Sequence, residues 1–294
     1  LDDNISELYS LGYFKTLYYE IYPHVDGWVN IIIHVAESSL RKLHLGLRWD
    51  NRYDFVGMAN VQLNTNLIPG IRIEGEIQFA GKLWKNKFGL SYPSRRLNFP
   101  IYPYIITTNS HHPFDHYSTE RFEGLYTYFS DEVRTGLGLI LKNYWNTEFE
   151  YFWNKAGLKT EQNLENPIQD KDNINVYSGI RILAQLDLLD DVLLPEDGIF
   201  IKGKHENSRT ILSSSENYEF YQVWGKIYKT FHLNTYGISA YHHEATYNTP
   251  LFMTTIFEGS QVFAGTNEFQ LHGSSLTFFR LDYRYKHQKD VFYH

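Results

Sequence analysis

The stretch 275–286, SLTFFRLDYRYK, decides the fold of this chain. Successive side chains of a β-strand point to opposite faces of the sheet. From Thr277 onward, apolar or aromatic residues alternate with charged ones: Phe279, Leu281, Tyr283 and Tyr285 against Arg280, Asp282 and Arg284. The pattern therefore predicts a strand with one apolar face and one charged face.

Two environments fit such a strand. In a soluble sandwich or small barrel, the apolar face packs in the interior and the charged face meets water. In a membrane-spanning barrel, the apolar face meets lipid and the charged face lines a wet lumen. A charged side chain facing the middle of a bilayer costs about 2–4 kcal/mol, so Arg280, Asp282 and Arg284 cannot face lipid.

Composition favours the membrane alternative. Aromatic residues make up 17% of the 294 residues, including 24 Tyr and 6 Trp, and such side chains suit the boundary between hydrocarbon and water. The mean hydropathy is −0.42, as expected for strands that are only half apolar. The net charge of −7, with both signs mixed, does not favour a nucleic-acid partner, and the absence of Cys excludes thiolate chemistry.

The same alternation recurs along the chain. Residues 41–50 place Leu43, Leu45, Leu47 and Trp49 on one face, and residues 71–80 repeat the pattern. Further strands are predicted at 54–64, 86–93, 97–108, 118–129, 133–142, 145–156, 174–187, 198–207, 217–230, 232–243, 275–286 and from 290. Tight joints, such as LPEDG before Ile199, alternate with long polar ones, such as 157–173 and 244–273.

The number of strands separates the two environments. A dozen or more strands would enclose a lumen too wide for side chains to fill, so water should occupy it. Short turns at one end and long loops at the other are typical of an up-and-down barrel in an outer membrane. The sequence therefore predicts an all-β, transmembrane antiparallel barrel over 39–294.

The first 38 residues follow another pattern. Residues 1–10 have Ile5, Leu8 and Tyr9 at helical spacing, and two strands, 13–21 and 28–36, are joined by PHVDG. Helix, strand and hairpin partner form about half of a small α+β module. Because the chain starts at Leu1, we expect it to be a processed or truncated fragment.

Residues 5–36, with the LGYF turn, the YYEI strand and the VNIIIHVAE strand, resemble the end of a POTRA domain. POTRA domains are the periplasmic modules of the BamA-like superfamily of outer-membrane assembly and secretion barrels. The following LHLGLRWDNRYDFVGMANVQL is similar to the start of that family's barrel. The resemblance implies a C-terminal POTRA part at 1–38 with a client-binding strand edge at Tyr18, Tyr19 and Glu20, and a barrel of sixteen strands, of which this chain lacks about two.

AGTNEFQLHG, 264–273, resembles the long loop that this superfamily folds into the barrel. Its residues Gly265, Asn267, Gln270, Leu271 and Gly273 would lie in the lumen, and Arg280, Asp282 and Arg284 would form the lumen wall. The G-x-x-x-x-Q-L-x-G form is closest to barrels attached to patatin-like phospholipases, which are type V autotransporters of the bacterial surface antigen family. The family usually carries Arg where this chain has Asn267, so Asp282 is expected to pair within its own strand.

Catalytic and metal sites are not expected in this segment. No G-x-S-x-G elbow and no patatin Asp-Gly-Gly or Asp-Gly-Ala occurs, so a lipase, if attached, lies upstream of Leu1. His111, His112 and His116 with Asp115 could bind a metal, whereas His242 and His243 cannot both face the same side of a strand; exposed loop or strand-end histidines are the more common case for both sets. Glu196-Asp197 and Asp190-Asp191 are read as solvated turn residues rather than as a Ca²⁺ site. No cofactor is expected.

Three functions follow from these patterns. The leading one is an outer-membrane barrel that anchors and translocates an attached or partner polypeptide, with its N-terminal module in the periplasm. Its partners would be outer-membrane lipid, the client polypeptide and the outer-membrane assembly machinery. The second is a BamA- or TamA-like assembly factor or a two-partner-secretion transporter. The third is a soluble β-rich binding protein, which would need no detergent.

Overall fold

The computed structural model describes residues 5, 14–24, 26–37, 39, 41–50, 53–64, 71–92, 100–118, 121–142, 144–163, 174–191, 194–256, 272–288 and 291–293. Almost all of these residues belong to antiparallel strands or to the turns between them, so the predicted all-β fold is confirmed. Among them, no helix has the length and apolar character needed to cross a bilayer.

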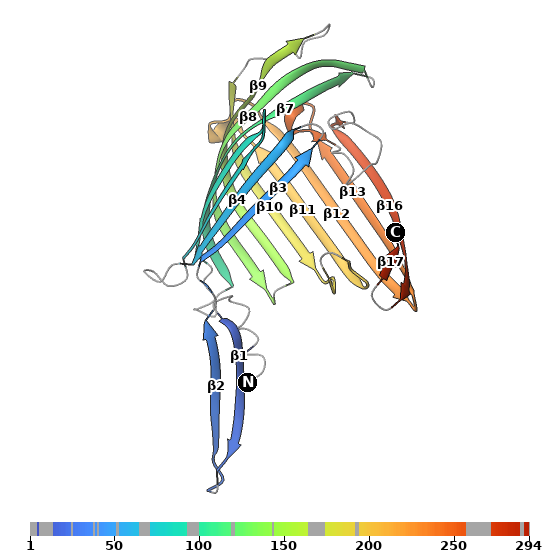
Figure 1. Cartoon of the computed structure of the whole chain (residues 1–294). Coiled ribbons are helices and arrows are strands. Elements are labelled where there is room, and N and C mark those ends of the chain that lie inside the picture. The colour runs from blue at the N-terminus through green and yellow to red at the C-terminus, as the bar shows by residue number, and fades with distance from the viewer. Residues whose placement is uncertain are drawn as a thin grey trace.

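A two-stranded hairpin forms the N-terminal part (Figure 1). Strand β1 (Phe14–Pro23) pairs with β2 (Val29–Glu37), and the turn between them includes Gly27 at φ 79°, a left-handed conformation that favours glycine. The register sets Leu17, Tyr19 and Ile21 on the same face as Val35, Ile33 and Ile31. Of the expected helix at 1–10, only Ile5 is described, and it is helical.

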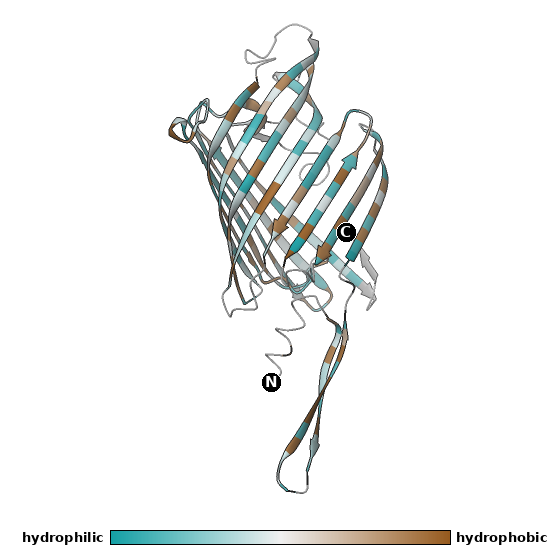
Figure 2. Ribbon diagram, turned by 90° about the vertical axis from the view of Figure 1, so that its left-hand side faces the viewer, coloured by the Kyte–Doolittle hydropathy of each residue, from teal (hydrophilic) through white to brown (hydrophobic). Residues whose placement is uncertain are grey.

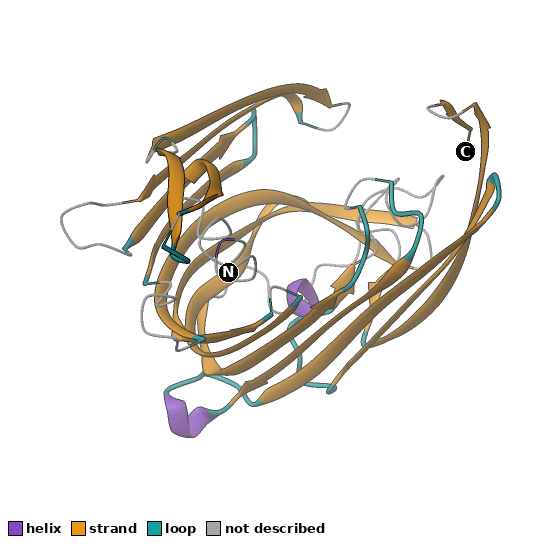
Figure 3. Cartoon of the chain, turned by 90° about the horizontal axis from the view of Figure 1, so that it is seen from below, coloured by secondary structure: helices purple, strands orange, loops and turns teal. Residues whose placement is uncertain are grey.

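The rest of the chain forms one large antiparallel sheet. Its strands are β3 (Arg41–Asp50), β4 (Asp54–Asn64), β5 (Arg72–Phe79), β6 (Trp84–Ser91), β7 (Ile101–Ser118), β8 (Arg121–Leu141), β9 (Trp145–Asn163), β10 (Ile174–Asp187), β11 (Gly198–Ser208), β12 (Tyr218–Phe231), β13 (Asn234–Ala245), β16 (Ser275–Gln288) and β17 (Val291–Tyr293). Each strand pairs with the next in this order, and β3 and β17 are the two end strands of the described sheet. The sheet curls round on itself (Figure 3), which gives it a concave and a convex face.

The convex face is mostly apolar, whereas the concave face carries buried charged side chains and, at the end remote from the hairpin, a cluster of buried aromatic ones. Leu45 and Leu281 on the convex face are 73% and 80% exposed. Arg284, which points to the concave face of β16, is 3% exposed. Figure 2 shows the resulting bands of hydrophobic and hydrophilic residues along the strands. The sheet thus buries charge on its concave face and exposes large apolar side chains on the other, the reverse of a soluble core.

Three strands are much longer than the sequence predicts. Strands β7, β8 and β9 have 18, 21 and 19 residues, against 8 to 11 for β3 to β6, and their far ends rise above the rest of the sheet (Figure 1). The predicted strands 118–129 and 133–142 are in fact one strand, β8. Strand β7 continues past residue 108, where the predicted strand ended. Residues 157–163, predicted to begin a long connection, belong to β9.

Two single-turn 3-10 helices lie in the connections at the end of the sheet remote from the hairpin. Helix η2 (Thr210–Leu212) joins β11 to β12 and lies outside the curled sheet, whereas η3 (Leu251–Met253) follows β13 and lies within it (Figure 3). Two short strands, β14 (Thr255–Ile256) and β15 (His272–Gly273), pair with each other between β13 and β16.

Candidate functional site

A cluster of charged side chains is buried on the concave face, around Arg181 of β10. The Arg181 guanidinium contacts three carboxylates, each from a different strand. These are Glu206 on β11 at 2.6 Å, Glu150 on β9 at 2.9 Å and Glu132 on β8 at 2.7 Å. Arg181 is 7% exposed and Glu150 is fully buried. We call these four residues, together with Arg134 and Lys204, the Arg181 cluster.

The two additional cations balance the charge of the Arg181 cluster. Arg134 lies 3.2 Å from Glu132, and Lys204 lies 3.1 Å from Glu206, so three carboxylates face three basic groups. Two tyrosines complete the set. Tyr104 donates a hydrogen bond of 2.8 Å to Glu150, and Tyr218 donates one of 2.6 Å to Glu206.

Such a cluster persists away from bulk water only because every charge is paired. An isolated buried carboxylate or guanidinium carries a desolvation penalty of several kcal/mol, which ion pairs and hydrogen bonds must offset. Because the members come from β8, β9, β10 and β11, the cluster also fixes how these strands stand against one another. With three carboxylates and three basic groups, the Arg181 cluster itself has no net formal charge.

A segment of the connection after β13 crosses the space enclosed by the sheet. Leu251, Phe252 and Met253, which form η3, pack against buried aromatic residues of distant strands. The Phe252 ring centroid lies 5.0 Å from that of Tyr128 on β8 and 6.0 Å from that of Tyr177 on β10. We call residues 251–253 the lumen segment, because it occupies the interior at the end remote from the hairpin.

The structure places Arg280, Asp282 and Arg284 together on the concave face of β16. Asp282 pairs with Arg280 of its own strand at 3.0 Å, as the sequence suggested, and accepts a 3.4 Å hydrogen bond from Tyr228. Arg284 donates to the carbonyl of Pro195, and its guanidinium lies 5.3 Å from the centre of the Tyr228 ring. Of the five expected loop residues, Gly273 lies in β15, and Gly265, Asn267, Gln270 and Leu271 lie outside the described residues.

The connection between β10 and β11 contacts β16, although β12 and β13 lie between β11 and β16 in the sheet. Besides the Pro195 carbonyl, Glu196 pairs with Lys286 at 2.8 Å. Lys229 donates a 2.5 Å hydrogen bond to Asp197, and this contact lowers the pKa of that carboxyl. The acidic turn is therefore held by lysines at the hairpin-side end of the sheet, which agrees with its interpretation as turn chemistry rather than as a Ca²⁺ site.

Asp190 shapes this connection, and we expect its removal to loosen it. Its Oδ1 accepts from the backbone N–H groups of Asp191, Glu196 and Asp197 at 2.9–3.1 Å. Asp190→Ala leaves these donors without that acceptor, so the local stability should fall by about 1–3 kcal/mol. Limited proteolysis of the detergent-solubilised protein should then cut faster within 188–197. Asp190→Asn keeps one oxygen acceptor and should be cut more slowly than Asp190→Ala; equal rates for these two variants would contradict the assignment.

Strand β1, with the candidate client-binding residues Tyr18, Tyr19 and Glu20, pairs with β2 along one of its edges. Tyr18 stacks on His34 at 4.6 Å, and Glu20 accepts from Tyr22, a contact that lowers the pKa of Glu20. The other backbone edge of β1 is not paired among the described strands. An edge of this kind can accept an extended peptide as a further strand.

The histidines singled out in the sequence lie on different faces of their strands. His112 and His116 face the concave side of β7 and His111 faces the other, because strand side chains alternate. His243 is fully buried, whereas His242 bonds Thr277 on the convex face. Within the described ranges, no group of three His, Asp or Glu residues could hold a metal ion.

Sequence reasoning missed the Arg181 cluster and the lumen segment. A signal existed for the first: Arg181 stands between Ile180 and Ile182, and Glu150 between Phe149 and Tyr151, so each is a charge with apolar neighbours on both sides. That these charges meet depends on the register between strands, which one sequence does not contain. The lumen segment consists of three apolar residues, Leu251, Phe252 and Met253, and nothing in so short a stretch indicates that it enters the interior of a barrel.

No family model and no curated protein matches the sequence. Solved structures do match. BamA from Haemophilus ducreyi, in a form lacking POTRA domains 1–3, has a TM-score of 0.72 at 10% identity over 99% of this chain and 62% of that one. CdiB from Escherichia coli has a TM-score of 0.62 at 9% identity and covers 96% of this chain and 55% of its own. CdiB from Acinetobacter baumannii has a TM-score of 0.52 at 8% identity and covers 95% of this chain and 53% of its own.

This likeness establishes the fold. The chain has the strand arrangement of the BamA and CdiB barrels, and it spans less than two thirds of the length of these relatives. The match concerns the fold alone, and the expectation that this segment is not an enzyme stays a prediction.

Proposed function

We propose that this chain is a bacterial outer-membrane β-barrel that anchors and translocates an attached or partner polypeptide, with the β1–β2 hairpin in the periplasm. The observation that carries the proposal is the inversion of the sheet: charge is buried on the concave face and large apolar side chains are exposed on the convex face. A soluble β-rich binding protein would bury the apolar face, so that alternative is not supported.

The lengths of strands β3 to β6 agree with the length needed to span a bilayer. A strand that crosses a membrane needs about 9–11 residues at a tilt of about 45°. Strands β3 to β6 have 8 to 11 residues. The convex side chains of β3 are Leu43, Leu45, Leu47 and Trp49, and all are well exposed.

The membrane assignment predicts opposite outcomes for two neighbouring residues of β3. Leu45→Arg places a cation on the lipid face at a cost of about 2–4 kcal/mol and should block assembly. His44→Arg places the same cation on the polar face and should be tolerated. Heat-modifiable migration of the membrane fraction on a gel reports assembly, and equal assembly of both variants would overturn the proposal.

Two alternatives are proposed for the client. An attached patatin-like phospholipase is proposed from the G-x-x-x-x-Q-L-x-G resemblance, with 1–38 as the end of a POTRA domain. The likeness to BamA and CdiB favours a second candidate, an assembly factor or two-partner-secretion transporter without a fused enzyme. The coding sequence upstream of Leu1 separates them: a lipase elbow supports the first, and further POTRA modules support the second.

In either case we propose that the client binds along β1 at Tyr18, Tyr19 and Glu20, as a further strand of the β1–β2 hairpin. Backbone hydrogen bonds would supply the affinity, and the side chains would select the residues of the client. The barrel itself would enter the membrane through the outer-membrane assembly machinery.

A further inference from the structure

Two lysines of the concave face stand at diagonal positions on neighbouring strands, Lys202 on β11 and Lys226 on β12. Lys202 is in register with Trp224, two residues from Lys226. Because side chains of a strand alternate, Lys202 shares its face with the buried Glu206, and Lys226 shares its face with the buried Tyr228. Diagonal neighbours on one face of an antiparallel pair of strands lie about 7–8 Å apart. We call Lys202 and Lys226 the lysine pair.

Neither member of the lysine pair is neutralised by a carboxylate. Across the part of the chain that the structure describes, neither ammonium group takes part in an ion pair or donates a hydrogen bond. Lys226 lies over the ring of Trp224, with its Nζ 5.0 Å from the ring centre. Asp187, the carboxylate nearest to Lys202 in the register of β10 and β11, accepts a 3.2 Å hydrogen bond from the Leu189 N–H instead.

Both ammonium groups remain open to the lumen. Lys202 is exposed, and Lys226 is partly exposed. The Lys226 Nζ is not among the solvent-shielded polar atoms that lack a partner in the described residues, whereas the nearby Trp224 Nε1 is. A dissolved anionic group can therefore reach both cations, which keep their donors free for it.

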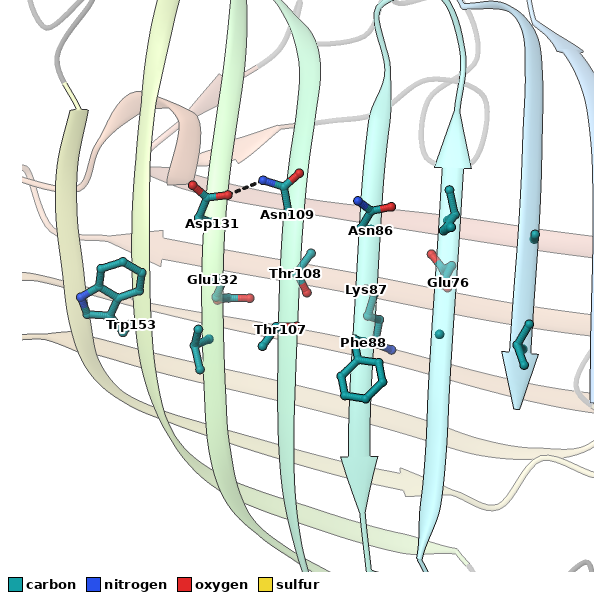
Figure 4. A pocket seen from close by; sticks show the side chains of 15 residues that line it. Glu76, Asn86, Lys87, Phe88, Thr107, Thr108, Asn109, Asp131, Glu132 and Trp153 are labelled. Atoms are coloured by element: carbon teal, nitrogen blue, oxygen red, sulfur yellow. Dashed lines mark hydrogen bonds between the residues drawn. The ribbon is translucent and has the colours of Figure 1, made fainter. Parts of the chain in front are cut away.

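A comparison within the same face shows what the lysine pair lacks. On β6, Lys87 is in register with Glu76 of β5, and Figure 4 shows these two side chains on neighbouring strands. The residues in register with the lysine pair are instead uncharged: Gln185 and Trp224 for Lys202, and Phe200 and Ser239 for Lys226. Two like charges that stand close together repel each other, so this part of the wall is stabilised by any anion that bridges them.

The lysine pair lies between the hairpin-side mouth of the sheet and the lumen segment. The lumen segment packs against Phe220, which is in register with Glu206. Lys202 stands four residues nearer than Glu206 to the hairpin-side end of β11, which is about 13 Å along the strand at about 3.4 Å per residue. A chain that enters from the hairpin side therefore meets the lysine pair before it meets the lumen segment.

We propose that the lysine pair binds carboxylate groups of an acidic segment in the polypeptide that the barrel translocates. This inference rests on the proposed function, which brings an extended polypeptide into the lumen. An Asp or Glu carboxylate of the client accepts charge-assisted hydrogen bonds from the two ammonium groups, and apolar parts of the client lie against the Trp224 ring. Lysines that line a water-filled pore attract anions by the same electrostatics.

Binding of a labelled oligo-glutamate peptide to the detergent-solubilised full chain, followed by fluorescence anisotropy, tests the proposal. The wild type should bind the peptide, and the affinity should fall as the salt concentration rises. Lys202→Gln and Lys226→Gln should each weaken binding about threefold, and the double variant about tenfold, as expected for ion pairs that stay partly solvated. Lys202→Arg keeps the charge and should bind nearly as well as the wild type.

Lys87→Gln is the matched control, because it removes a lysine from the same face of the sheet at a position that has Glu76 in register. Its affinity for the peptide should stay within about twofold of the wild type. The variants of the lysine pair have no ion pair to lose, so they should keep the heat-modifiable migration of the folded barrel. If Lys87→Gln weakens binding as much as Lys202→Gln does, the peptide senses diffuse charge and the lysine pair is not a site.

Three further results would overturn the assignment. They are equal binding of an oligo-glutamine peptide, unaltered binding by the double variant, and tighter binding of inorganic phosphate than of the peptide, which would make the lysine pair a site for small anions. Failure of the proposed function would show differently, as a wild type that does not enter membranes in the gel assay.

Discussion

Arg181→Met should destabilise the folded barrel by about 3–5 kcal/mol, the usual loss when one member of a buried ion cluster is removed. The substitution keeps a long apolar stem but leaves Glu132, Glu150 and Glu206 without their shared guanidinium. Urea unfolding of the protein in lipid vesicles, followed by tryptophan fluorescence, measures the free energy of unfolding. If Arg181→Met folds with a lower yield than the wild type, that lower yield also indicates destabilisation.

Two further variants separate charge from packing. Arg280→Met also removes an arginine from the concave face, but Arg280 is one-third exposed and pairs with Asp282 in its own strand, so the loss should be about 0–1 kcal/mol. Adding Glu150→Gln to Arg181→Met removes one uncompensated charge and should recover part of the stability. Equal losses for Arg181→Met and Arg280→Met would mean that the Arg181 cluster does not hold the wall together.

Phe252→Ala should open the interior of the barrel. Phe252 anchors the lumen segment between Tyr128 and Tyr177, and removing a phenyl ring from such a contact costs up to about 3–5 kcal/mol when the ring is fully buried. Phe252 is only partly buried, so the segment should loosen without unfolding the sheet. Single-channel conductance in planar bilayers should rise well above the wild-type value.

Tyr247 offers a matched control in the same connection. Its side chain is 99% exposed, so Tyr247→Ala removes an aromatic ring that anchors nothing in the interior. Conductance should then match the wild type. If Phe252→Ala also conducts like the wild type while remaining heat-modifiable, the lumen segment does not close the path.

The sequence predicted the strands that lie in the apolar belt better than those that leave it. The alternation in 41–50, 71–80 and 275–286 located β3, β5 and β16 to within about two residues. It failed at 130–132, where Ser-Asp-Glu looked like a break but continues β8. Beyond the belt both faces of a strand can be wet, so polarity no longer marks orientation there, and β7 and β9 were shortened for the same reason.

The candidate site was predictable only where it depends on one strand. The shared face of Arg280, Asp282 and Arg284 follows from the period of two, and so does the pairing of Asp282 within β16. The Arg181 cluster needs four strands in register, and the lumen segment needs a contact between residues more than a hundred positions apart. Neither is encoded in local pattern.

The strict alternation of faces also restricts how such a chain can change length during evolution. One residue inserted into β10 ahead of Arg181 would rotate the remainder of that strand by half a turn, turning the guanidinium toward hydrocarbon and Ile182 toward water. Insertions and deletions tolerated inside the strands should therefore arrive in pairs or be absorbed by a bulge, whereas the connections at either rim can gain or lose single residues freely.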